Sequence, residues 1–549
     1  MAADHPPKQT PILIAGAGPV GLTLAIALAK FGVDCVVVER NTDTTRHPKM
    51  DITNGRSMEI FRRLGIADKI ITAGVPPNIC LDVAWITSFV GHEIHRFKYA
   101  SPNEARARYR ALNDGSQATE PGIRISQIVV EPLLRDIAAV SPHITLCYGW
   151  TFERLKHETN NIAVTVSDSG TGDEKEISCA YLAGCDGGNS KVREALGIGL
   201  SGQAAIRRRY SVHFHSRDKN ILEPWGPAWH YQSPVHGTLI SQDGQNNFTL
   251  HSALGSNEDE NTIDPYDVVR RFVGRDIDFK LLLASGWDNN LLVAEKYGER
   301  RVFLAGDSAH QYIPTGGYGM NTGIGDAYTL SWMLAALVQG WGGPGLLAAY
   351  ERERLPVGLR NREASRRHAD LRLKISEFWE DGLEASGSNS AEARIRVGSK
   401  IANLGNAENE SFGIELGYGY PSSPLILGCN EPSLKENPLI YHPTTVPGYR
   451  VPSLYLDIGE PIYDHFGTGF TLLNFQPERI DTTAFDASAK SLGLPLKIVS
   501  LSDSYARELY DSDLVLLRPD DHACWRGDSL PEDITPVLAK VTGRASTGR

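Results

Sequence analysis

The feature that most constrains this chain is a glycine-rich turn near its start, which joins a short apolar run to a helical pattern. Residues 12–15 are apolar and stop at Gly16-Ala17-Gly18-Pro19-Val20-Gly21, and a second apolar run over 35–38 ends at Glu39. In such a unit Gly16 permits the tight turn, Gly18 lets the backbone approach a pyrophosphate, and Gly21 lets the helix press on the strand. The carboxylate of Glu39 can accept hydrogen bonds from the hydroxyls of a ribose. The pattern predicts a βαβ unit that binds a dinucleotide; the alternative is a glycine turn that binds nothing.

A second motif follows a predicted strand in the middle of the chain. Asp186 and Gly187 come at the end of an apolar run over 181–185, and Ser190 and Arg193 lie on the helix expected next. The motif resembles the Asp-Gly signature of flavin-dependent aromatic hydroxylases, and this resemblance implies that Asp186 and Gly187 contribute to the same cofactor site. An Asp-Gly pair is also a common turn, and Ser190 could simply begin a helix, so a structural interpretation stays open.

The third motif joins a buried strand to a glycine-rich loop and a long apolar helix. Residues 301–305 lead into Gly306 and Asp307, whose carboxylate can hold a ribityl hydroxyl, and the helix is expected over 322–338. Backbone N–H groups at a helix start stabilise the negative charge of a reduced flavin, and glycines let the backbone lie close to its ring. We expect His310 to pack or hydrogen-bond rather than to catalyse. The loop residues expected at the flavin are Pro314, Gly316, Gly317, Gly319, Met320 and Asn321.

Length and composition limit the possible functions. At 549 residues the chain is too long for one hydrophobic core, since domains average about 150 residues. The net charge of -11 argues against a nucleic-acid-binding surface, and the basic run over 207–209 is too short to reverse this. The seven cysteines form no C-x-x-C pair and no zinc-like spacing, so we expect reduced thiols in a cytoplasmic protein and no metal site. Residues 11–38 alternate into the βαβ unit, so membrane insertion is not expected.

The stretch between the second and third motifs has a different pattern. Residues 200–293 contain alternating apolar and polar runs such as 210–215, which predict a half-exposed antiparallel sheet inserted there. Residues 384–390 are rich in Ser, Gly and Asn and are the best candidate for a linker. After residue 440 a compact block begins, with short strands expected at 471–473, 496–499 and 513–517.

These motifs, in this order, resemble those of class A FAD-dependent aromatic monooxygenases, the para-hydroxybenzoate hydroxylase superfamily. The tail, with Pro447-Gly448-Tyr449-Arg450-Val451-Pro452 and Tyr463-Asp464-His465-Phe466-Gly467, is similar to that of the phenol hydroxylase branch. The resemblance implies an α/β fold: a Rossmann-like FAD-binding domain, an inserted antiparallel-sheet substrate domain and a C-terminal thioredoxin-like domain without a redox role. The implied boundaries are 1–199 for the first FAD-binding part with an excursion to the substrate domain near 78–120, 200–293 for the substrate domain, 294–390 for the second FAD-binding part, 391–439 for a linker region and 440–549 for the thioredoxin-like domain.

The resemblance also implies the cofactors and the reaction. NAD(P)H, with NADPH the expected form, reduces FAD, and molecular oxygen then forms a flavin C4a-hydroperoxide that attacks an electron-rich ring. The expected partners are a small phenolic or polycyclic aromatic substrate and a second copy of the chain in a homodimer, with no nucleic acid. A phenol reacts best when it is partly deprotonated, so a proton acceptor beside its hydroxyl should speed the step.

Asp51 is the expected acceptor, because phenol hydroxylase has a catalytic aspartate at the matching place before an arginine. The alternative is that Asp51 caps the helix expected near Ser57 or is a plain loop acid. Residues expected beside the flavin are Arg40, Arg46, Arg56 and Gln127; the last three could instead lie on the surface. Residues expected to bind substrate are Asp51, His213, Trp229, Tyr231 and Pro314, with Trp225 and His230 as further candidates, although aromatic residues in strands more often belong to the core.

Other functions on the same fold remain open at this point. Baeyer-Villiger oxygenation and epoxidation share these motifs with hydroxylation and are separated by the mass and regiochemistry of the product. A flavin reductase or dehydrogenase would oxidise NAD(P)H without adding oxygen to a substrate. A non-catalytic flavoprotein would not need the intact loop with Pro314, Gly316 and Gly317.

Overall fold

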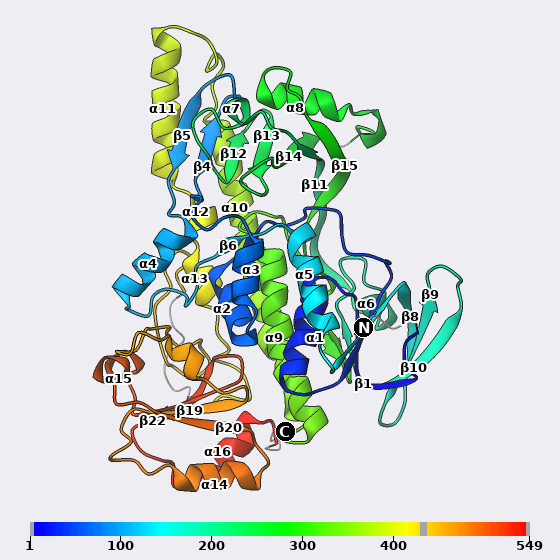
Figure 1. The fold of residues 1–549 in the computed structure, drawn as a ribbon, viewed down its shortest axis with the longest axis vertical. Coiled ribbons are helices and arrows are strands. Elements are labelled where there is room, and N and C mark those ends of the chain that lie inside the picture. Colours follow the sequence, from blue (N-terminus) through cyan, green and yellow to red (C-terminus); the bar gives the residue numbers. More distant parts are fainter. Residues whose placement is uncertain (1–4, 256, 429–435, 545–549) are drawn as a thin grey trace.

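The computed structural model describes residues 5–255, 257–428 and 436–544, so Cys429 lies outside the described residues. Figure 1 shows the first sheet, which begins with the N-terminal strand, and its helices in the middle. The inserted sheet is at the top and the C-terminal block at the bottom. Among the described residues, no helix has the length and apolar character needed to cross a membrane. The six described cysteines are free thiols.

In the first sheet the three motifs follow the carboxyl ends of the parallel strands β1, β10 and β17. This end of the sheet is the motif edge. The main path of the sheet runs in the order β16-β17-β10-β1-β2-β7, and β1 pairs in parallel with both β10 and β2, since Ile12 lies opposite Tyr181 and Cys35. Strands β1 and β2 are buried along nearly their whole length, because α1 (Pro19–Lys30) packs against both and β8 also contacts β2. The fold is the α/β arrangement expected from the sequence. The strands are β1 Gln9–Ala15, β2 Cys35–Glu39, β7 Ile144–Tyr148, β8 Trp150–His157, β9 Ile162–Asp168, β10 Glu174–Gly184, β16 Gly298–Glu299 and β17 Val302–Leu304.

The helices around the first sheet place the glycine loops. Helix α1 (Pro19–Lys30) packs against α9 (Tyr318–Gln339), which begins four residues earlier than its apolar pattern indicates because Gly317 forms its N-cap in a left-handed conformation. A two-stranded ribbon of β3 (Ile52–Thr53) and β6 (Ile123–Arg124) lies beside them. The neighbouring helices are α2 Gly55–Leu64, α3 Ala67–Ala73, α4 Pro102–Leu112, α5 Gln127–Ala139 and α6 Lys191–Ala195.

The inserted sheet has the order β18-β15-β11-β14-β13-β12-β4-β5, so residues 83–97 join strands from 200–294 in one sheet. Even-numbered residues of β11, such as Val212 and Phe214, pack beneath α7 (Lys219–Leu222) and α8 (Pro265–Val273). Odd-numbered residues of the same strand face the opposite way. The strands are β4 Val83–Ile86, β5 Glu93–Phe97, β11 Leu200–His215, β12 His230–Ser233, β13 Gly237–Ser241, β14 Asn247–Leu254, β15 Lys280–Ala294 and β18 His310–Gln311.

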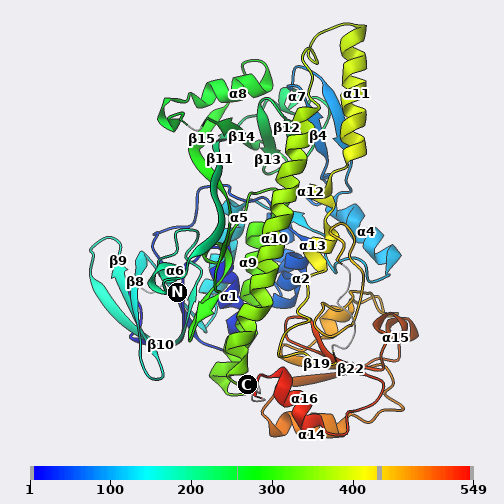
Figure 2. The same cartoon turned by 180° about the vertical axis from the view of Figure 1, so that it is seen from behind.

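The segment expected as a linker region, 391–439, contains helices in its described part. Figure 2 shows the long helix α10 (Gly345–Glu377) running beside both sheets, with α11 (Ser388–Leu404) after it. Val397 and Ile401 of α11 are buried against Trp85 of β4, so this helix belongs to the packing of the inserted sheet. Two short helices follow, α12 Ala407–Glu410 and α13 Phe412–Leu416.

The C-terminal block is a four-stranded sheet, order β20-β19-β21-β22, in which β19 and β20 are parallel and the other pairs antiparallel. Buried ion pairs join it to the rest of the chain: Arg518 contacts Glu353 of α10 at 2.6 Å, and Arg450 contacts Glu59 of α2. Its elements are β19 Phe470–Asn474, β20 Leu496–Ser500, β21 Leu514–Leu517, β22 Ala523–Gly527, α14 Thr483–Ser491, α15 Ser504–Tyr510 and α16 Ile534–Val541.

Candidate active site

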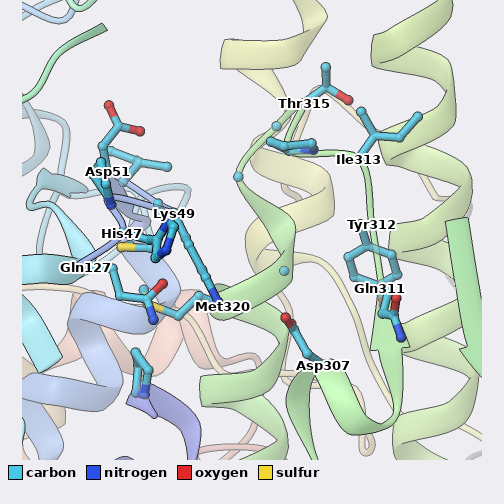
Figure 3. A pocket seen from close by; sticks show the side chains of 18 of the residues that line it. His47, Lys49, Asp51, Gln127, Asp307, Gln311, Tyr312, Ile313, Thr315 and Met320 are labelled. Atoms are coloured by element: carbon cyan, nitrogen blue, oxygen red, sulfur yellow. The ribbon is translucent and has the colours of Figure 1, made fainter. Parts of the chain in front are cut away.

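A cavity of about 1990 Å³ lies between the motif edge of the first sheet and the odd-numbered face of β11 in the inserted sheet. Pockets for a single small ligand occupy about 300–1,000 Å³, so this one has room for a large cofactor and a second molecule. Figure 3 shows Asp51, His47 and Lys49 on one side of it and Ile313 and Thr315 on the other. The predicted site residues that line it are Gly16, Gly18, Glu39, Arg40, Arg46, Asp51, Gln127, Asp186, Gly187, His213, Trp229, Asp307, Pro314, Gly316, Gly317, Gly319 and Met320.

The first motif has the geometry of a phosphate-binding turn. Gly16 has φ +104°, and a Cβ there would lie 2.3 Å from the carbonyl oxygen of Cys185. A Cβ on Gly21 would lie 2.0 Å from the carbonyl oxygen of Gly16, so Gly21 serves close packing behind the cavity wall. Gly18 differs, because a Cβ there would meet no protein atom within 4 Å and would project into open space. Glu39 accepts a hydrogen bond from the backbone N–H of Ala17 at 2.9 Å, which fixes its carboxylate beside this turn.

The second motif contributes a half-buried carboxylate, one oxygen of which makes no hydrogen bond to a described residue. Asp186 accepts from the backbone N–H of Val192 through Oδ2 at 3.1 Å, while its Oδ1 is buried without a partner among the described residues. Burial raises the pKa of this carboxyl. Arg193 donates to the carbonyl oxygens of Gly188 and Ser308, both at 3.1 Å, and so ties the second motif to the third.

The third motif presents one carboxylate and a glycine loop to the cavity. Asp307 is open to the cavity, although protein surrounds it closely enough to raise its pKa, and its carboxylate makes no hydrogen bond to a described residue. Gly316 and Gly317 have φ +84° and +66°, a conformation that favours glycine. His310 is fully buried with Nε2 2.9 Å from Asp326, which is the hydrogen-bonding role expected for it. Gly306 lies behind the wall against Val20.

Asn321 does not line the cavity, but it joins the glycine loop to the segment that carries Asp51. Its amide donates to the carbonyl oxygens of Gly317 at 2.7 Å and Ile52 at 3.1 Å, and its Oδ1 accepts from the N–H of Asn54 at 3.0 Å. Asn321 therefore links the glycine loop to the residues that directly follow Asp51.

Asp51 lies where the first and inserted sheets meet. Its carboxylate accepts a hydrogen bond of 2.5 Å from the indole Nε1 of Trp229, and a guanidinium nitrogen of Arg124 lies 3.9 Å away. The Arg124 guanidinium also lies over the Trp229 ring, 5.8 Å from its centre. Burial raises the pKa of Asp51, and Arg124 and Trp229 oppose that rise. A carboxylate in this environment is a stronger proton acceptor than an exposed aspartate.

Besides Gly21, Gly306 and Asn321, two more expected site residues do not line the cavity. Arg56 is buried and directed at the C-terminal block, where it contacts Asp521 at 3.3 Å and donates to the carbonyl oxygen of Asp520 at 2.8 Å. Tyr231 is fully buried in the core beneath the inserted sheet, and its hydroxyl donates to the carbonyl oxygen of Gly226 at 2.8 Å. Trp225 also lies on that side, stacked on Phe89, whereas His230 lines the cavity.

Sequence patterns did not single out several cavity residues. Arg124 comes from β6, and its contact with Asp51 depends on the pairing of β6 with β3. The alternation along β11 could have identified Arg207 and Arg209, since each is an even number of residues from His213 and faces the same side. The other unanticipated lining residues include Lys49, His251, Trp287, Arg372 and Glu415.

These features fit an FAD molecule. The open space at Gly18, the unpartnered Oδ1 of Asp186 and the free carboxylate of Asp307 supply a pyrophosphate approach and hydrogen-bonding positions along an extended cofactor. Glu39 would hold the adenosine ribose, Asp307 the ribityl chain, and the loop at Gly317 the flavin ring.

Comparisons with known proteins agree with this geometry. A family model described as the FAD binding domain matches residues 9–365, and one described as the C-terminal domain of aromatic-ring hydroxylases matches residues 444–545. The FAD-dependent monooxygenase apdD from Emericella nidulans is 36% identical to this chain, over 97% of the chain and 90% of its own length.

Solved structures show the same fold over the whole chain. The rebeccamycin biosynthetic enzyme RebC with reduced flavin is 33% identical, with a TM-score of 0.87 over 98% of this chain and 100% of its own. Aklavinone-11 hydroxylase in a ternary complex with FAD and aklavinone is 26% identical, with a TM-score of 0.82 over the same shares. The resemblance inferred from the motifs is confirmed, and this chain belongs to the class A FAD-dependent monooxygenases, in the family of aromatic-ring hydroxylases.

Proposed function

We propose that this monooxygenase hydroxylates a phenolic ring of an extended aromatic substrate, with Asp51 as the acceptor of the phenol proton. The observation that carries this proposal is the position of Asp51, which lines the cavity where the two sheets meet. When bound, FAD supplies reducing equivalents taken from NAD(P)H and the activated oxygen. The cavity size, and the polycyclic ligand named for aklavinone-11 hydroxylase, support a substrate of several rings.

The residues of this chain have separate roles in that reaction. Asp51 would accept the hydrogen bond of the ring hydroxyl and draw off its proton, which raises the electron density of the ring. Trp229 and Arg124 would hold the carboxylate in place. The ring would lie against the inserted sheet near His213, with Pro314 on the opposite wall, and these walls would keep water from the reacting oxygen.

We infer further properties from the same resemblance. The mixed four-stranded sheet of the C-terminal block supports a thioredoxin-like fold, and the absence of a C-x-x-C pair supports a structural role. The unpaired thiols support a reducing compartment such as the cytoplasm. We also propose NADPH as the preferred reductant and a homodimer as the assembly.

Substrate-stimulated turnover tests this function. The purified FAD-loaded protein should oxidise NADPH faster in the presence of a suitable phenol, and under ¹⁸O₂ the product should gain one labelled oxygen atom. A phenol that stimulates NADPH oxidation without gaining oxygen would indicate a reductase instead. Insertion of oxygen into a ring C–C bond would indicate a Baeyer-Villiger reaction.

A further inference from the structure

One wall of the cavity carries three arginines, and one of them, Arg209, has no ion pair within the described part of the chain. On β11, Arg207 and Arg209 face the cavity, and Arg372 of α10 faces the same region. Arg372 is paired with Glu408, with two contacts of 2.6 Å. Arg209 has no ion pair with a described residue, and the charged groups that act on it are the two arginines Arg207 and Arg372.

Arg209 is held in place by the sheet rather than by a counter-ion. On β11 it lies opposite Ala253 of β14 and Trp287 of β15, and its side chain is half-buried. Burial, with help from Arg372 and Arg207, lowers the pKa of Arg209 to about 10, so it stays cationic at neutral pH. A half-buried cation without an anion is unfavourable, and a ligand anion would relieve that cost.

A neutral hydrogen-bond donor lies beside this cation. Trp287 donates from Nε1 to the hydroxyl of Ser211 at 2.8 Å, and that hydroxyl is 2.7 Å from Nδ1 of His251. The indole occupies one of the two acceptor positions of the Ser211 hydroxyl; with the Ser211 hydrogen directed to Nδ1, the ring hydrogen of a neutral His251 is on Nε2 and faces the ligand as a donor. Burial and the charges of Arg209 and Arg372 lower the pKa of His251 to about 4, so the ring is neutral at neutral pH.

We infer that the substrate is an aromatic acid whose carboxylate pairs with Arg209 and accepts a hydrogen bond from His251, at the end remote from the ring that is hydroxylated. The inference rests on the proposed function, because it assigns the opposite end of the substrate to Asp51. An anion in this position neutralises the charge of Arg209 and leaves the ion pair between Arg372 and Glu408 in place.

The sheet order sets the length of such a substrate. Trp229, which holds Asp51, directly precedes β12, while Arg209 is on β11, and β13 and β14 lie between them. Three strand-to-strand steps amount to about 14 Å at the spacing of a β-sheet. A molecule that reaches from Asp51 to Arg209 is therefore elongated, with its phenol and its carboxylate at opposite ends.

Matched acids and amides test the inference on the FAD-loaded protein. The long probe is 4′-hydroxybiphenyl-4-carboxylate with its carboxamide, and the short probe is 4-hydroxybenzoate with its carboxamide; binding is followed by the change in the flavin absorbance spectrum. The long acid should bind about 10- to 100-fold more tightly than its amide, the range expected for hydrogen bonds to a charged group. The preference should be smaller for the short pair, which does not span the distance.

Substitutions on β11 test whether Arg209 causes the preference for the long acid over its amide. Arg209→Met should abolish the preference for the long acid and leave binding of the amide unchanged, whereas Arg209→Lys should keep part of the preference because it keeps the charge. Arg208→Met is the matched control. Arg208 directly precedes Arg209, does not line the cavity and donates a hydrogen bond to the carbonyl oxygen of Glu258 at 2.8 Å. FAD content and melting temperature of each variant show that it is folded.

Two outcomes would overturn the inference. One is that the long acid fails to bind the wild-type protein more tightly than its amide, whether or not either binds. The other is that Arg209→Met weakens the acid and the amide equally. The proposed function is judged separately, by whether any phenol, charged or neutral, is converted into a product heavier by one oxygen atom.

Discussion

Trp229 donates a hydrogen bond from its indole to the carboxylate of Asp51, although 178 residues separate the two in the chain. The bond joins the start of β12 in the inserted sheet to the residue before β3, which belongs to the flavin side of the cavity. Asp51 thereby stays at the junction of the two parts of the site, with 8% of its surface exposed. The donor also stabilises the ionised form of a carboxyl whose burial favours the protonated form.

Asp51→Asn should lower the rate of hydroxylation by about 10²- to 10⁴-fold, because an amide cannot accept the phenol proton. The ionised carboxylate is the active form and its pKa is raised above 3.8, so wild-type activity should fall as the pH drops through a value higher than that of a free aspartate. This acidic decline should disappear in the variant. Product formation measured against pH checks both points. Asp68→Asn, at an exposed position of helix α3, is the control. An unchanged pH profile in Asp51→Asn would contradict the role.

Trp229→Phe should move the acidic decline of activity upward by about one pH unit. The phenyl ring retains much of the packing but removes the N–H donor, and a hydrogen bond to a charged group contributes about 1.5–3 kcal/mol. The loss of that bond raises the pKa of Asp51, since the donor lowers it. Trp225→Phe, at a tryptophan stacked on Phe89 away from the cavity, should leave the profile in place. A fall in rate at all pH values without a shift would assign Trp229 a packing role alone.

The sequence alone predicted the positions of those site residues that belong to one local strand, turn and helix. Gly16, Gly18 and Glu39 are positioned by one strand, turn and helix, so their spacing predicted their placement. Asp51 came from the resemblance to phenol hydroxylase. Trp229 was expected in the substrate site, but neither its contact with Asp51 nor the presence of Arg124 there could be predicted, because these contacts require two separate strand pairings to meet.

Tyr231 and Arg56 lie away from the cavity for simple geometric reasons. Tyr231 is two residues from Trp229, but Trp229 precedes β12, so strand alternation does not relate the two side chains; within the strand His230 faces the cavity and Tyr231 the core. Arg56 follows Gly55, which lines the cavity, and one step along a helix turns a side chain by about 100°. That rotation directs Arg56 to Asp521 instead.

Arg518→Met should destabilise the protein by about 3–5 kcal/mol, because it removes the cation that pairs with two buried carboxylates. Arg518 contacts both Glu353 and Asp520 at 2.6 Å, and all three side chains are almost fully buried. Thermal unfolding should therefore begin at a lower temperature than in the wild type. Arg396→Met is the control, since its exposed pair with Glu380 contributes at most about 1 kcal/mol. Equal melting temperatures for the two variants would show that this contact does not hold the C-terminal block in place.

Gly18→Ala and Gly21→Ala should separate cofactor binding from folding, although both change one glycine of the same motif. Gly18 has φ −70° and ψ 179°, which alanine adopts freely, and its added Cβ meets no protein atom within 4 Å. The apoprotein should keep its melting temperature, while the methyl group occupies space that the pyrophosphate needs, so FAD affinity should fall by about tenfold or more. In Gly21→Ala the Cβ would lie 2.0 Å from the carbonyl oxygen of Gly16, so the apoprotein itself should melt earlier. Flavin titration and thermal unfolding of both apoproteins make the comparison. If Gly18→Ala bound FAD as the wild type does, the pyrophosphate would have to lie elsewhere than at this turn.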